Sequence, residues 1–183
     1  MQLTNYYWYF KSAIPHRICD DIVRYGKSIQ DQMAVTGGLG NKKLNKNQVK
    51  DLKKKRDSNI VWMNDRWIYK EIQPYVHQAN QNAGWNFQWD FSESCQFTKY
   101  EKGQFYDWHC DGWDKPYIRE DTNAPDHGKI RKLSVTVTLS DPKDYKGGEL
   151  EFDFRNLDPD KKRNVKKCKE ILPKGSLVVF PGF

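Results

Sequence analysis

The spacing of apolar residues changes near residue 85, and this change constrains the fold more than any other feature of the chain. Before it, apolar residues recur at steps of three and four over Ile18, Ile22, Tyr25, Ile29 and Met33, which predicts an amphipathic helix ended by Gly37-Gly38. A second helix is predicted after Asn64 or Asp65, either of which could cap it. Pro74 inside that helix either kinks it or marks its weaker end, and its inner face would carry Ile68, Ile72, Tyr75, Val76 and Ala79.

Beyond residue 85 the pattern is typical of short strands separated by turn residues. Strands are expected at 6–10 and 59–63, and then at 85–91, 94–101, 104–111, 131–139, 148–154, 169–172 and 175–180. The Lys/Arg-rich stretch 161–169 is interpreted as a hairpin tip, and 112–130 as a long connection of the kind that often forms a lid. Helices followed by many antiparallel strands predict an α+β chain whose β part is a sandwich or jelly roll. At 183 residues we expect one domain, with a helical part at 1–84 and a β core at 85–183.

Composition and cysteine spacing indicate the cellular compartment of the protein. No apolar run approaches the roughly 20 residues of a membrane-spanning helix, and the N-terminus does not resemble a signal peptide. The four cysteines are far apart in sequence and form no C-x-x-C pair, so they are interpreted as free thiols of a reducing compartment. These features together predict an intracellular, cytoplasmic protein with no membrane partner.

The net charge of +7 has a local origin. Residues 37–56 hold eight of the 31 basic residues and one of the 24 acidic ones, which leaves 23 of each sign elsewhere. We therefore expect one mobile basic loop and no basic face. A solvated loop is the simpler interpretation, and an acidic partner, protein or nucleic acid, is the alternative.

The stretch Tyr106-Asp107-Trp108-His109-Cys110-Asp111 contains a candidate pair of metal ligands. On a strand, residues two apart point to the same face, so His109 and Asp111 would converge. Tyr106 would share no face with them and is interpreted as packing or as lining for a substrate. A histidine and a carboxylate are two of the three ligands in the 2-His-1-carboxylate triad of non-haem Fe(II) oxygenases. The triplet is weak evidence by itself, so its surroundings must decide.

Those surroundings resemble the catalytic core of Fe(II)- and 2-oxoglutarate-dependent dioxygenases, in particular the prolyl/lysyl-hydroxylase-like group that includes PKHD-type enzymes and prolyl 4-hydroxylases. The resemblance covers residues 96–183 and rests on 96–106 leading into His109-x-Asp111, on 131–140, on Gly147-Gly148-Glu149-Leu150 and on 173–181. It implies a double-stranded β-helix, or jelly roll, with the N-terminal helices packed on it. It further implies Fe(II) and 2-oxoglutarate as cofactors, O2 as co-substrate and L-ascorbate as an additional reductant.

The resemblance also implies roles for single residues. His109 and Asp111 would be metal ligands, with the third ligand, a histidine, and the basic residue that grips 2-oxoglutarate expected beyond Phe183. Tyr100 and Thr138 would bind 2-oxoglutarate, against the alternative that they are a core tyrosine and a strand threonine. His127 is interpreted as a surface histidine and not as a replacement ligand.

The expected activity is hydroxylation of a peptidyl or free amino-acid side chain, proline first, with release of succinate and CO2. Two alternatives stay open. A nucleic-acid oxidative demethylase on the same core would use the basic segment, although the balanced charge elsewhere argues against it. A non-catalytic jelly-roll binding module would lack the third ligand. The oligomeric state is not indicated by the sequence.

Overall fold

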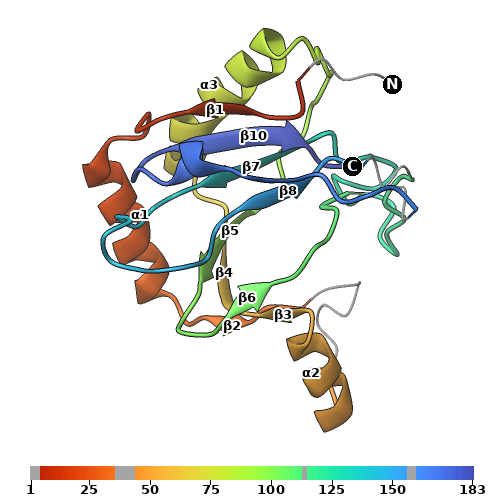
Figure 1. Ribbon diagram of the computed structural model, residues 1–183. Helices are drawn as coiled ribbons and strands as arrows, with labels where there is room; N and C mark the ends of the chain where they lie inside the picture. Colours follow the sequence, from red (N-terminus) through yellow and green to blue (C-terminus); the bar gives the residue numbers. More distant parts are fainter. Residues whose placement is uncertain (1–4, 36–43, 113–114, 156–159) are drawn as a thin grey trace.

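The computed structural model describes residues 5–35, 44–112, 115–155 and 160–183 (Figure 1). Its helices and strands follow in the order β1 (Trp8–Phe10), α1 (His16–Ser28), β2 (Gln32–Met33), α2 (Lys46–Lys53), β3 (Arg56–Asp57), β4 (Asn59–Met63), α3 (Arg66–Asn82), β5 (Cys95–Lys99), β6 (Phe105–Tyr106), β7 (Leu133–Val137), β8 (Glu151–Asp153), β9 (Val165–Lys167), the 3₁₀ turn η1 (Lys169–Ile171) and β10 (Leu177–Pro181). The order confirms an α+β chain in which most of the helical residues precede most of the strands.

The first sheet joins the two ends of the described chain. Its order is β1-β10-β7, with both pairings antiparallel, and Val179 lies between Trp8 and Val135 in the register. Leu177, Val178 and Val179 of the central strand are fully buried. Because side chains alternate along a strand, Leu177 and Val179 face one side of this sheet and Val178 faces the other.

Helices α1 and α3 connect this sheet to a second one, which has the antiparallel order β2-β4-β5. Cys19 of α1 and Ala79 of α3 pack in one buried cluster with Leu177 and Val179. One turn further along α1, Ile22 packs in another cluster with Val61 of β4 and Ile68 of α3. The two helices thus hold both sheets together, and the predicted inner face of α3 is confirmed at Ile68 and Ala79.

Two strand pairs complete the described structure. The β8-β9 hairpin and η1 pack on the other side of the first sheet, where Val178 meets Cys168 and Ile171. The β3-β6 pair places Arg56 opposite Tyr106. In Figure 1 this pair lies below β4 and β5, and α2 projects away from the body of the molecule.

The sequence prediction was wrong about two segments of the N-terminal half. The first helix ends at Ser28, with Ile29 already extended, and Met33 belongs to β2, where it pairs with Asn59 of β4. Pairing with a neighbouring strand has overridden the helical spacing of these apolar residues. The glycines expected to end the helix lie outside the described residues.

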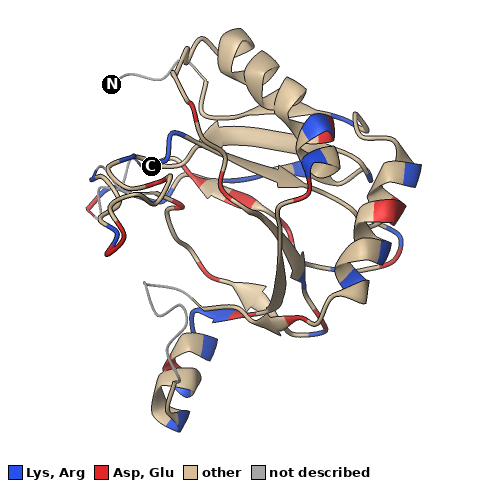
Figure 2. Cartoon of the chain, turned by 180° about the vertical axis from the view of Figure 1, so that it is seen from behind, with Lys and Arg blue, Asp and Glu red and all other residues tan. Residues whose placement is uncertain are grey.

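The basic segment is also not a loop where the structure describes it. Residues 46–53 form α2, which begins with a reciprocal capping box between Asn45 and Gln48. The lysines gather on this helix, whereas both signs of charge are spread over the rest of the described chain (Figure 2). Arg56, the last of the basic run, is buried.

The strand expected at 59–63 is confirmed with the same bounds. Those expected at 94–101, 131–139, 148–154 and 175–180 are confirmed with shorter or slightly shifted bounds, and β1 is shorter than 6–10. No strand forms at 85–91, the 169–172 segment is a 3₁₀ turn, and 104–111 is a strand only at Phe105–Tyr106. The hairpin tip expected at 161–169 contains β9 itself. The described part of 112–130 has neither helix nor strand, as predicted for a connection.

None of the described helices is both long enough and apolar enough to cross a membrane. The four cysteines are free, as the sequence predicted.

Candidate metal centre

The segment that carries His109 and Asp111 is held at both ends by backbone hydrogen bonds. At its start, the Asp107 N–H donates to the carbonyl oxygen of Lys55 over 2.8 Å, which continues the β3-β6 pairing. At its end, the Gly112 N–H donates to the carbonyl oxygen of Gly182, just after β10. Residues 107–112 therefore bridge the short β3-β6 pair and the end of the first sheet, without forming a strand themselves.

His109 and Asp111 converge in this segment, as predicted, but through a turn and not through strand alternation. His109 Nε2 lies 3.0 Å from Asp111 Oδ1. The other ring nitrogen, Nδ1, lies 2.6 Å from the carbonyl oxygen of Asp107. A carbonyl oxygen can only accept a hydrogen bond, so Nδ1 carries a proton and Nε2 is the nitrogen left to face Asp111 or a metal ion.

The electrostatic environment of His109 and Asp111 favours a protonated imidazole beside an ionised carboxylate. Burial lowers the pKa of His109, but the hydrogen bonds to Asp111 and to the Asp107 carbonyl outweigh burial, and the net effect is a raised pKa. Burial raises the pKa of Asp111, yet hydrogen bonds from His109 and Ser134 outweigh it and the pKa is lowered. In the metal-free protein Nε2 therefore donates its proton to the hydrogen bond with the anionic Asp111, and a metal ion bound between the two groups would replace that proton.

The distance between these two atoms fits a divalent metal. Ligand atoms at adjacent corners of an octahedron, each bonded at about 2.1 Å, are about 3.0 Å apart. Both side chains are also open to ligands, since 34% of the His109 side chain and 28% of that of Asp111 is exposed. Within the described residues, no third His, Cys, Asp or Glu joins them to complete a metal-binding group.

Behind His109 lies a stack of rings that the sequence did not predict. The ring of Tyr106 lies parallel to the His109 imidazole, with centroids 3.6 Å apart and planes 14° apart. The guanidinium of Arg56 lies over the Tyr106 ring, 4.3 Å from its centroid. The strand-parity argument had separated Tyr106 from His109, and it fails because the strand ends at Tyr106.

Arg56 was missed because it closes a run of lysines and was assigned with them to a solvated loop. One signal was available, since Arg56 stands three residues before the apolar strand Asn59–Met63. A cation that directly precedes a buried strand can be drawn into the structure with it.

The two residues predicted to bind 2-oxoglutarate lie in different places. Tyr100 follows β5 and has Arg56 and Ser58 as neighbours. Burial raises the pKa of its hydroxyl, and this effect outweighs the lowering by the charge of Arg56. Thr138 follows β7 and exchanges backbone hydrogen bonds with Gly175 and Ser176. Ser134, which contacts Asp111, is four residues earlier on the same strand, or about 13 Å away at the usual rise. The structure thus places Tyr100 beside Arg56 and Ser58, and it leaves Thr138 at the end of β7 that is away from Asp111.

The remaining histidines do not approach the pair. His127 accepts a hydrogen bond from the Arg119 N–H at its Nδ1, within the 112–130 connection. His16 begins α1, and His77 of α3 stacks on Trp89. The interpretation of His127 as an ordinary histidine agrees with this placement.

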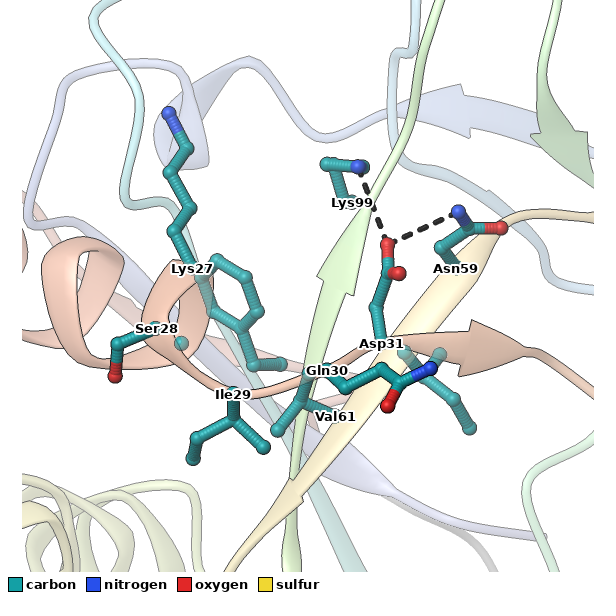
Figure 3. Close-up of a pocket in the computed structure, with 11 residues that line it drawn as sticks. Lys27, Ser28, Ile29, Gln30, Asp31, Asn59, Val61 and Lys99 are labelled. Carbon is teal, nitrogen blue, oxygen red and sulfur yellow. Dashed lines mark hydrogen bonds and ion pairs between the residues drawn. The ribbon is translucent and has the colours of Figure 1, made fainter.

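A pocket of about 410 Å³ lies elsewhere, between the C-terminal end of α1 and strands β4 and β5 (Figure 3). Asp31 accepts a hydrogen bond from the Asn59 side chain over 3.0 Å and pairs with Lys99 Nζ at 3.1 Å. The polar groups at its centre therefore satisfy one another. His109, Asp111, Tyr106 and Arg56 are not among the residues that line it, so we do not assign metal binding to this pocket.

Comparison with known proteins agrees with the geometry of the pair. Residues 95–183 match the model of the 2OG-Fe(II) oxygenase superfamily. This part of the chain is therefore similar to members of that superfamily. It is also 35% identical over 89 residues to a PKHD-type hydroxylase of Synechococcus sp. (strain CC9902), an alignment that spans 48% of this chain and 31% of the relative. The chain thus spans about a third of the length of that curated relative.

Solved structures show that the likeness in fold extends over nearly the whole chain. A viral collagen prolyl hydroxylase from Paramecium bursaria Chlorella virus-1, solved as a 2OG complex, aligns with 97% of this chain and 78% of its own at a TM-score of 0.58 and 22% identity. A prolyl-4-hydroxylase from Pseudomonas putida aligns with 98% of this chain and 82% of its own, also at a TM-score of 0.58, with 17% identity. The N-terminal helices are therefore part of the shared fold, and the superfamily supplies Fe(II) and 2-oxoglutarate as the cofactors to test.

Proposed function

We propose that this chain is the catalytic part of an Fe(II)- and 2-oxoglutarate-dependent hydroxylase that acts on an amino-acid side chain, with peptidyl proline as the first substrate to test. The observation that carries the proposal is the 3.0 Å approach of His109 Nε2 to Asp111 Oδ1, in a segment that matches the superfamily. The prolyl hydroxylases among the structural neighbours support proline as the substrate.

In this proposal His109 and Asp111 hold Fe(II), and each contributes something different. The Asp107 carbonyl holds the imidazole with Nε2 ready to bind, and Asp111 supplies an anionic oxygen that suits a hard cation. The bound iron and 2-oxoglutarate supply the oxidising chemistry, which converts 2-oxoglutarate and O2 to succinate and CO2 while one oxygen atom enters the substrate. Tyr100 and Thr138 stay candidates for 2-oxoglutarate binding, and L-ascorbate a candidate reductant.

We also propose that the four small sheets are parts of one jelly-roll domain and that the third ligand, a histidine, follows Phe183. The second point is supported by the backbone next to Asp111. The Gly112 N–H donates to Gly182 O, and the Gly182 N–H donates to Lys132 O over 3.0 Å. Residues that continue from Gly182 therefore start beside Asp111.

The test is an anaerobic titration with Fe(II) and 2-oxoglutarate, observed through the weak visible charge-transfer band of the complex. It is made on this chain and on a polypeptide that continues past Phe183. We expect the band in the longer polypeptide, its loss in His109→Ala and Asp111→Asn, and no change in the control His127→Ala. A band that survives both substitutions would refute the assignment of the ligands, and no band in either polypeptide would leave a non-catalytic binding module.

Substrate class is tested separately with the longer polypeptide. Proline-containing peptides should gain the mass of one oxygen atom and release succinate in equal amount, and free proline tests the small-molecule alternative. Methylated single-stranded DNA tests the oxidative demethylase alternative. Demethylation of the DNA without hydroxylation of any peptide would overturn the proposed substrate class.

A further inference from the structure

Arg56 is a buried cation at the base of the candidate metal centre. Only 4% of its surface is exposed, although it follows a run of exposed lysines. It is buried because it opens β3 and pairs across the strands with Tyr106 of β6. The same pairing fixes its position relative to the segment that carries His109 and Asp111.

The guanidinium is held on two sides. Its Nε donates a hydrogen bond to Ser58 Oγ over 2.9 Å. Its plane lies over the ring of Tyr106, which in turn stacks on His109. One aromatic ring therefore separates the guanidinium from the imidazole, and the charge has a fixed orientation.

The charge of Arg56 has no counter-ion in the described part of the chain. Its Nη2 is buried and finds no hydrogen-bond partner there, and no described carboxylate lies within ion-pair distance. Its neighbours Tyr100 and Tyr106 present hydroxyl groups and aromatic rings to the guanidinium, and no carboxylate. A buried charge without a partner is unfavourable, and proteins keep such groups where a ligand completes them.

We propose that Arg56 is a carboxylate-binding residue of this centre, with Nη2 donating to a carboxylate oxygen of the ligand that His109 and Asp111 receive. The guanidinium suits a carboxylate because its N–H donors lie in one plane and carry a permanent positive charge. The carboxylate comes either from a 2-oxo acid or from an amino-acid substrate. The inference rests on the proposed function for the position of that ligand.

The test observes Arg56 directly in the metal-free chain. Protein labelled with ¹⁵N-arginine gives a guanidinium signal for an ordered arginine, and Arg56→Lys assigns it by its disappearance. We expect this signal to shift on titration with 2-oxoglutarate or with N-acetylproline, and to stay in place with N-acetylprolinamide, which lacks the carboxylate. A shift with 2-oxoglutarate alone assigns the carboxylate to the 2-oxo acid, and a shift with N-acetylproline alone assigns it to the substrate.

Affinities of the variants give a second readout. We expect Arg56→Met to weaken carboxylate binding about ten- to a hundredfold and Arg56→Lys to retain part of it. Arg24→Met is the matched control, because Arg24 is exposed on α1 and pairs with Asp21. If Arg56→Met does not fold, the shift of the wild-type signal decides. The proposal is overturned if neither carboxylate shifts the Arg56 signal more than the amide does.

Failure of this proposal and failure of the proposed function are distinguishable. Zn(II) titration of the wild type and of His109→Ala measures metal binding without reference to Arg56. A chain that binds carboxylates at Arg56 but no metal at His109 supports the inference and contradicts the function. A chain that binds metal at His109, but whose Arg56 signal does not shift with either carboxylate, supports the proposed function and contradicts this inference.

Discussion

At the scale of single residues, a backbone carbonyl decides what His109 can do. The carbonyl oxygen of Asp107 accepts a hydrogen bond from the Nδ1–H and so leaves Nε2 directed at Asp111. The pair is about one-third exposed, so it contributes little to the stability of the metal-free fold. Its geometry is better explained by ligand binding than by stability.

Asp111→Asn should therefore separate function from stability. We expect the affinity for divalent metal to fall at least about tenfold, because the anionic ligand is lost. The free energy of unfolding in EDTA should change by less than about 1 kcal/mol. Metal titration and urea unfolding check the two quantities, with Asp126→Asn, in the ion pair with Arg119, as the control for metal affinity. A large loss of stability with unchanged metal affinity would contradict the assignment.

Tyr69 gives a prediction about alkaline pH. Its hydroxyl donates to the carbonyl oxygen of Glu93 over 3.0 Å, and burial raises its pKa to about 12. An unfolded tyrosine ionises near 10, so the folded state retains the proton longer. The stabilising contribution is complete below pH 10 and is lost as the pH rises from about 10 to about 12.

Tyr69→Phe removes that contribution along with its hydrogen bond, at a cost of about 1 kcal/mol near neutral pH. The difference in unfolding free energy between wild type and variant should shrink across this alkaline range. Urea unfolding at a series of pH values measures it. A difference that stays constant up to pH 12 would show that the hydroxyl is not protected.

The site residues show what sequence could and could not predict at this scale. His109 and Asp111 were found because the His-x-Asp spacing would bring the two side chains together in a strand. The irregular backbone that the segment adopts also brings them together. Tyr106 and Arg56 were missed because their positions depend on where β6 ends and on its pairing with β3. Such long-range pairing leaves no periodic signal in a two-residue strand.

At the scale of elements, the turn before β10 joins the first sheet to α1. The Ile14 N–H donates to the carbonyl oxygen of Gly175 over 2.9 Å, and Gly175 has a φ of +79°. A Cβ at this glycine would lie 2.1 Å from the carbonyl oxygen of Ile14, which is backbone and cannot move alone. Gly103 has a similar φ of +82° but open space where a Cβ would stand.

The two glycines therefore form a matched pair. Gly103→Ala should cost about 1 kcal/mol, which is the strain of a left-handed alanine. Gly175→Ala should cost at least about 3 kcal/mol, since the clash adds to the strain. Thermal or urea unfolding measures both, and equal losses would mean that the approach of Ile14 is not tight.

The cap of α2 leads to a more local prediction. Asn45 accepts from the Gln48 N–H over 2.9 Å, and the Gln48 side chain accepts from the Asn45 N–H over 2.9 Å. Asn45→Ala should cost about 1 kcal/mol, expressed as faster amide exchange in α2. Exchange in α3, whose Asp65 cap makes no side-chain hydrogen bond, should not change and is the internal control. Uniform acceleration through both helices would contradict a local role.

Element type was predictable where an element is long and periodic, and it was not where pairing competes with periodicity. Helix α3 has nearly the expected inner face, because one side packs on both sheets. Met33 fits the spacing of α1 equally well, yet it pairs with Asn59 of β4. Helix α2 was missed because its capping residues, Asn45 and Gln48, stand among lysines that were interpreted as a mobile loop.

At the scale of the whole molecule, the part that matches the superfamily contains only some of its own packing partners. Residues 95–183 include β10, but β1 covers one edge of that strand, and α1 and α3 cover one face of its sheet. Leu177 and Val179 would lose the buried apolar neighbours that the N-terminal part supplies. Sequence alone assigned the family to this half, whereas the structure shows how it depends on the other.

A fragment of residues 95–183 should consequently fail to fold. We expect poor dispersion in its ¹H–¹⁵N spectrum and no cooperative thermal transition, whereas the 183-residue chain shows both. Adding residues 1–94 as a separate chain should restore some dispersion if the interface alone is missing. A well-dispersed spectrum of the isolated fragment would refute the proposal of one domain.

The pairing of Trp8 with Val179 also sets the order of events during synthesis. Strand β1 leaves the ribosome long before its partner β10 is synthesised, and α1 must dock on a sheet whose central strand does not yet exist. Contacts between distant residues slow folding, and unpaired apolar strands invite aggregation while they wait. The aromatic strand Trp8–Phe10 is thus the segment that a chaperone would have most reason to shield in the nascent chain.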